Sequence, residues 1–152
     1  MDTPWEPIPG PRCWELLGTA SVGRLALSVR ALPVILPVQY YVTRHRIAAC
    51  LGHHEIPERS LNDAVIAFTA DAIDPVTRSG WSVQIQGRTS ARRGGDVGIA
   101  CGQPSAGQIV EIEPATITGY HVRLCPFIDA LLGGPRPPPG LRAMLRVGHP
   151  VS

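Results

Sequence analysis

Few side chains in this 152-residue chain combine the residue types and spacing that protein chemistry requires. Cys50, His53 and His54 lie close together and suggest a metal site. A tetrahedral site needs a fourth ligand, and a tight loop seldom turns neighbouring histidines onto one ion. The four cysteines form no CxxC pair and match no zinc spacing. We therefore expect no metal site, and we favour free, partly buried thiols over a disulfide.

Acid–base and nucleophilic chemistry find equally little support. Glu111 and Glu113 occupy alternate positions on one predicted strand face, a pattern more typical of solvated carboxylates than of a catalytic pair. None of the five histidines lies near a candidate nucleophile elbow, and no Ser/His/Asp order is convincing. All 14 basic residues are arginine, which excludes a lysine Schiff base or a P-loop lysine. An enzyme built on this chain would therefore take its chemistry from a bound cofactor, and we assign no catalytic residue.

Charge and hydropathy narrow the class of partner and the compartment. The formal net charge is +2 with no basic run, so we do not expect nucleic acid as the partner. The longest uncharged stretches, such as residues 31–43, are interrupted by prolines and are shorter than a membrane span of about 20 residues. The first residues lack the basic and apolar regions of a signal peptide. We expect a cytoplasmic protein that does not act at a membrane.

The hydrophobic periodicity predicts a mainly β fold with a minor helical part. Residues 1–10 carry three prolines and predict an irregular arm, and a helix is expected over 11–19, starting at a proline. Period-two patterns then predict strands over 22–28, 33–41, 46–51, 64–70, 81–88, 108–113 and 116–124. Short strands at this spacing favour a small, closed or partly closed β-barrel of about six to seven strands over residues 11–125.

Local features refine this prediction. Pro33 and Pro37 suggest an edge or bulged strand, because proline cannot donate to the ladder. The strand over 64–70 is apolar on both faces and is therefore expected to be central. Residues 126–132 could include a short helix, and the Pro/Gly-rich stretch that follows predicts a semi-rigid linker and a mobile tail to residue 152.

Several segments, in chain order, resemble the pyridoxamine 5′-phosphate oxidase-like proteins, and together they span about residues 12–124. The most specific is 67–88, which contains Ser79-Gly80-Trp81-Ser82-Val83 and is similar to a stretch typical of actinobacterial flavin- or deazaflavin-dependent members. The matching segments are 13–17, 22–26, 33–40, 67–88, 113–114 and 117–119. No internal repeat accompanies them.

The resemblance implies a split β-barrel that binds FMN and dimerises, with two cofactor sites at the subunit interface. The isoalloxazine ring would lie along the strand at 36–40, and residues 81–83 of the opposite subunit would help to enclose it. Flavin N5 would pass a hydride to or from a small-molecule substrate. The residues implied in cofactor binding are Leu36, Pro37, Val38, Gln39, Tyr40, Cys50, Arg59, Ser60, Trp81, Ser82 and Val83.

The chain departs from the family pattern where the cofactor phosphate is usually held. Ala49 and Cys50 stand where relatives carry an Arg-Ser/Thr pair, and the following Ser-Lys region is replaced by residues 52–60. Arg59 and Ser60 are the obvious substitutes there, because a phosphate dianion needs charge-assisted donors. His53 or His54 could add donors, whereas Glu55 and Glu58 would oppose the phosphate. The 89–107 segment, Gly-rich and basic, replaces a helix that covers the cofactor in many relatives.

Three functions therefore remain open. The first is an FMN-dependent oxidoreductase. The second keeps the barrel but uses the deazaflavin coenzyme F420, whose longer acidic tail would suit an open groove with arginines. The third is a split-barrel protein that has lost firm cofactor binding and acts as a dimeric binding or stress-related module, which the missing phosphate anchors suggest.

Overall fold

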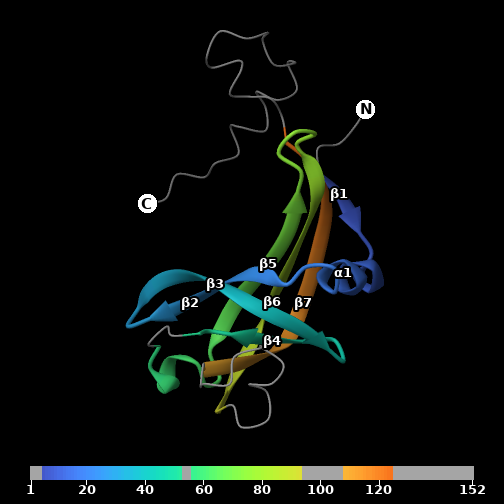
Figure 1. Cartoon of the computed structure of the whole chain (residues 1–152). Helices are drawn as coiled ribbons and strands as arrows, with labels where there is room; N and C mark the ends of the chain where they lie inside the picture. The colour runs from blue at the N-terminus through green and yellow to red at the C-terminus, as the bar shows by residue number, and fades with distance from the viewer. Residues whose placement is uncertain (1–4, 53–55, 94–107, 125–152) are drawn as a thin grey trace, which may run out of the picture.

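The computed structural model describes residues 5–52, 56–93 and 108–124, drawn as the coloured ribbon in Figure 1. They form a mainly β fold, as the periodicity predicts. The elements are β1 (Trp5–Ile8), α1 (Gly10–Leu17), β2 (Val22–Val29), β3 (Leu32–Thr43), β4 (Arg46–Cys50), the 3-10 turn η1 (Glu58–Ser60), β5 (Val65–Ile73), β6 (Ser79–Arg93) and β7 (Gln108–Arg123). In this part of the chain no helix is long and apolar enough to cross a membrane.

All strand pairs are antiparallel, and the sheet closes on itself. The strands follow the order β1-β7-β4-β3-β2-β5-β6, and β6 pairs with β7 to complete the ring. The long strand β7 has three partners: β6 along its length, β4 at 109–112 and β1 at 119–122. In Figure 1, β5, β6 and β7 rise steeply while β3 and β4 lie across them. This is the predicted split β-barrel.

The two ends of the barrel sequence differ from the expected boundaries. Within the predicted irregular arm, Trp5–Ile8 forms β1 by pairing with β7. The two strands expected over 108–113 and 116–124 are a single strand, β7. Pro114 lies opposite Gly87, where the β6–β7 register shifts, and between the stretches of β7 that pair with β4 and β1. A bulge at this position accommodates the missing proline N–H, so the strand continues.

The remaining predicted strands are present, although β3, β5 and β6 extend beyond the predicted ends, β6 as Ser79–Arg93 where 81–88 was expected. Pro33 and Pro37 lie in the half of β3 that pairs with β2 alone, because β4 pairs only with residues 39–43. The prolines therefore occupy a local edge. Strand β5 is internal to the sheet, between β2 and β6. The predicted helix is present as α1.

The core fills the barrel and extends under α1. Tyr40 is 2% exposed, and its ring meets Phe68 edge to face at 4.9 Å. Its hydroxyl donates to the Leu17 carbonyl at 2.7 Å and so joins β3 to the end of α1. On the other side of α1, a Cβ at Gly119 would lie 2.5 Å from the Cys13 sulfur. Glycine at this position lets α1 approach β7 closely.

The Tyr40 hydroxyl gives a test of this packing. Tyr40→Phe keeps the ring but leaves the buried Leu17 carbonyl without its donor, so the free energy of unfolding should fall by about 1–2 kcal/mol. Chemical denaturation measures the change. Tyr41→Phe is the matched control, because Tyr41 is 40% exposed. An equal effect of the two substitutions would contradict the assignment of Tyr40 to the α1–β3 junction.

Candidate functional site

The implied cofactor-binding residues of β3, positions 36–40, lie on two opposite faces of the strand. Val38 and Tyr40 are each 2% exposed and point into the core together with the half-buried Leu36. Pro37 and Gln39 are exposed on the outer face. This follows from the period-two alternation of a strand. A ligand on the outside of the barrel therefore meets the side chains of Pro37 and Gln39, and only the backbone of the other three residues.

The outer face of β3 combines apolar surface with one amide. Ile35 is 68% exposed and lies on the same face as Pro37 and Gln39. Gln39 pairs in register with Cys50 on β4, so these two implied residues are brought together. On the side away from β2, residues 32–38 of β3 pair with no described strand. Within the described residues, the backbone groups on that edge therefore have no strand partner.

The expectation of free thiols is wrong for Cys50. Cys13 is free and buried, and burial raises the pKa of its thiol above the usual value. Cys50 is disulfide-bonded, and the second cysteine of that bond lies outside the described residues. Spacing along the chain does not reveal such pairs, because a closed barrel brings distant segments together. The Cys50 thiol is therefore not a free hydrogen-bond donor for a ligand.

The 81–83 motif is not brought next to β3 within one chain. Val83 is fully buried and Trp81 packs against the core, whereas Ser82 lies on the opposite face of β6. Strands β2 and β5 separate β6 from β3. Three strand spacings amount to about 14 Å along the sheet. Ser82 therefore does not lie beside Gln39 within one chain, and the role of residues 81–83 at the site of an opposite subunit stays a prediction.

Arg59 and Ser60 belong to the η1 segment, residues 56–64, which connects β4 to β5. Arg59 is exposed, and its side chain makes no ion pair or hydrogen bond with the part of the chain described here. The start of the η1 segment is held by Gln108, whose Nε2 donates to the Ile56 carbonyl at 3.0 Å. The other amide atom, Gln108 Oε1, is buried and has no hydrogen-bond partner among the residues that the structure describes. His53, His54 and Glu55 lie outside the described residues.

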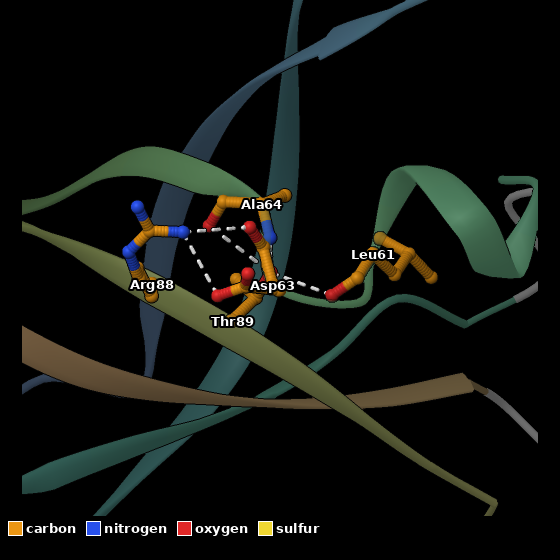
Figure 2. Close-up of polar contacts among 5 residues, drawn as sticks. All are labelled: Leu61, Asp63, Ala64, Arg88 and Thr89. Carbon is orange, nitrogen blue, oxygen red and sulfur yellow. Dashed lines mark hydrogen bonds and ion pairs between the residues drawn. The ribbon is translucent and has the colours of Figure 1, made fainter.

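The end of the η1 segment is held by β6, as Figure 2 shows. Thr89 is 4% exposed, and its hydroxyl donates to the Leu61 carbonyl at 2.5 Å and accepts from the Ala64 N–H at 3.2 Å. Arg88 donates to the Asp63 carboxylate at 2.9 Å. Sequence reasoning did not single out Thr89, although it continues the inward row of Trp81, Val83, Ile85 and Gly87. A polar residue at the next inward position was the available signal.

The two carboxylates examined for catalysis are engaged in an ion pair. Glu111 and Glu113 both contact Arg46 on β4, at 2.6 Å and 3.5 Å. This contact raises the pKa of the Arg46 guanidinium, chiefly through the hydrogen bond to Glu111. The pair therefore links β4 to β7 on the surface. In the three described ranges, no group of three or more His, Cys, Asp or Glu residues is arranged to hold a metal ion.

The family follows from comparison with known proteins. The family model described as pyridoxamine 5′-phosphate oxidase matches residues 10–97, more than half of the chain. The chain belongs to the pyridoxamine 5′-phosphate oxidase family. An uncharacterized protein of Mycobacterium tuberculosis is 36% identical over 78 residues, which cover 48% of this chain and 51% of that protein. The match thus spans about half the length of this curated relative.

Several solved structures share the fold of this chain. The FAD binding protein from Mycobacterium smegmatis superposes with a TM-score of 0.62 at 21% identity, over 78% of this chain and 99% of that one. A FAD-binding protein from Mesorhizobium loti gives a TM-score of 0.60 at 14% identity, over 77% of this chain and 96% of its own. At these identities the similarity establishes the split barrel.

The burial of the Tyr40 phenol predicts that the folded protein loses stability at alkaline pH. Burial raises the pKa of the Tyr40 phenol from 10.0 to about 12 in the folded protein. Between these values the unfolded chain loses the proton first, so the stabilisation present below pH 10 is lost as the pH rises toward 12. Urea unfolding across this range should show the wild type losing stability more steeply than Tyr40→Phe. Parallel pH profiles for the two proteins would contradict the burial of the phenol.

Proposed function

We propose that this protein is a flavin-dependent oxidoreductase that binds FMN on the outer face of β3, between two copies of the chain. Membership of the pyridoxamine 5′-phosphate oxidase family supports a flavin-related oxidoreductase. The observation that carries the proposal is the open edge and mixed outer face of β3, with an unengaged guanidinium on the η1 segment. When bound, the flavin supplies hydride transfer at N5 to or from a small-molecule substrate.

The outer face of β3 suits a flat, mostly apolar ring with a polar edge. Ile35 and Pro37 provide apolar contact, and the Gln39 amide can both donate and accept. The unpaired edge of residues 32–38 adds backbone carbonyls, which orient a ligand without charge, but few N–H donors, because Pro33 and Pro37 have none. A few polar groups beside an apolar surface are the usual composition of a cofactor site.

The η1 segment suits the phosphate and ribityl end of the cofactor. Arg59 contributes a guanidinium whose donors are free for a phosphate, and Ser60 adds a hydroxyl. The buried, unpartnered Gln108 Oε1 could accept from a ligand hydroxyl beside this segment. Glu58 precedes Arg59 and carries the opposite charge. The site therefore depends on one guanidinium where relatives use an Arg-Ser/Thr pair and a Ser-Lys pair.

A second copy of the chain would complete the site. Exposed apolar side chains lie on the same outer side of the sheet, with Ile35 68% and Val65 70% exposed. Between them, Ala26 and Ala67 pair in register and continue this surface across β2 and β5. Contiguous apolar surface of this kind favours burial against a partner. A homodimer would also bring Ser82 of one subunit toward Gln39 of the other.

The test is the visible absorption spectrum of the purified protein after gel filtration, with FMN or F420 added in turn. We expect a flavin band that travels with the protein at the elution volume of a dimer. A band only with F420 would support the deazaflavin alternative. A colourless protein that retains neither cofactor would contradict the proposal and favour the non-catalytic binding module, for which the substituted phosphate anchors at Ala49 and Cys50 argue.

Arg59→Ala tests the phosphate contact. Loss of one hydrogen bond to a charged group should weaken FMN binding by about 1.5–3 kcal/mol, or roughly 10- to 150-fold in Kd. Arg12→Ala is the matched control, because it removes the same charge from an exposed pair on α1. Figure 1 shows α1 and η1 on opposite sides of the barrel. Fluorescence titration measures both variants, and an unchanged Kd for Arg59→Ala would refute the contact.

A further inference from the structure

We propose that Thr89 is a positioning residue that holds the η1 segment in place so that Arg59 and Ser60 can bind the cofactor phosphate. The inference rests on the proposed function, because it assigns a role within the same flavin site. It starts from an anomaly of the core. In the described part of the core, which is otherwise almost entirely apolar, the Thr89 side chain is 4% exposed, and only the Tyr40 phenol carries a comparably buried hydroxyl.

Thr89 fixes four backbone groups of the η1 segment at once. Its hydroxyl donates to the Leu61 carbonyl and accepts from the Ala64 N–H. Its backbone N–H donates to the Ala64 carbonyl at 3.0 Å, and its carbonyl accepts from the Asp63 N–H at 2.7 Å. These contacts converge on residues 61–64 from a single position on β6 (Figure 2). The end of η1 is therefore attached to the barrel wall.

The attachment of residues 61–64 also restrains Arg59 and Ser60, the two residues proposed to bind the phosphate. Leu61 directly follows Ser60, is 1% exposed, and donates its N–H to the Glu58 carbonyl. The carbonyl that accepts from the Thr89 hydroxyl thus belongs to Leu61, the residue that caps the end of η1. With Gln108 holding Ile56 at the other end, the turn that carries Arg59 is tied at both sides. Such preorganisation lowers the cost of ordering donors around a ligand.

The remaining contacts on the segment are weaker constraints. The Arg88–Asp63 pair is exposed, with side chains 61% and 81% accessible, and pairs of this kind contribute little. Asn62 accepts from the Ala91 N–H at 3.0 Å, also at an exposed position. Asp63 adopts a left-handed backbone with φ of 52°, which an aspartate tolerates only at some cost. Among the side-chain contacts on residues 61–64, the one made by the Thr89 hydroxyl is therefore the most buried.

The experiment compares FMN with riboflavin, which has the same ring and ribityl chain but no phosphate. The ratio of the two dissociation constants isolates the phosphate contact from the ring contact. In Thr89→Val the hydroxyl is replaced by a methyl group of similar size, and in Thr89→Ser it is kept. Thr19→Val is the matched control, because that hydroxyl donates in the same way to the Leu16 carbonyl at the end of α1.

We expect Thr89→Val to lower the preference for FMN over riboflavin about tenfold, the size of one weakened charge-assisted hydrogen bond. Thr89→Ser and Thr19→Val should keep the wild-type preference. A purely structural role of Thr89 would weaken FMN and riboflavin equally, and that result would overturn the inference. An unchanged preference in Thr89→Val would overturn it as well.

If Thr89→Val does not fold, Thr89→Cys replaces the hydroxyl with a weaker S–H donor, and it should lower the FMN preference in the same direction. An unchanged preference in that variant then overturns the inference. A wild-type protein that binds neither flavin contradicts the proposed function and this inference together, whereas a normal wild-type preference kept by the variants contradicts the inference alone.

Discussion

The pairing of β6 with β7 is the constraint on which the rest of the structure depends. It runs along the whole of β6 and closes the ring of strands. Because β7 is longer than β4, its far half is left for β1, and α1 packs against that half where Gly119 leaves room. The near half carries Gln108, while the facing end of β6 carries Thr89. Closure of the barrel thus places both supports of the η1 segment.

Closure also decides which residues can meet a ligand. In a small closed barrel the inward side chains fill the interior, so only the outward positions of each strand remain for ligand binding. On β3 this divides a contiguous stretch into Val38 and Tyr40 inside and Pro37 and Gln39 outside. The proposed site can therefore use the side chains of Pro37 and Gln39, but only the backbone of Val38 and Tyr40. Ser82 lies three strands away from β3 around the barrel. The proposed site therefore takes Ser82 from a second subunit.

Local patterning predicts much of this fold, because period-two alternation directly reflects burial. The strands from 22 to 88 and the helix follow from it, as does the local edge at Pro33 and Pro37. Local patterning does not indicate which distant segments of the chain pair with one another. Strand β1 forms by pairing with the far half of β7. Pro114 is tolerated within β7 because the β6–β7 register shifts there, between the stretches that pair with β4 and β1. The Cys50 disulfide and the Thr89 hydroxyl likewise depend on segments that the barrel brings together.

The most direct test of this account is a crystal structure of the protein with FMN. The account predicts the ring against the outer face of β3 beside Pro37 and Gln39, and the phosphate at Arg59 and Ser60 of the same chain. It also predicts Ser82 of a second copy close to the ring. A flavin bound elsewhere on the barrel, or one whose phosphate is held without the η1 segment, would contradict it.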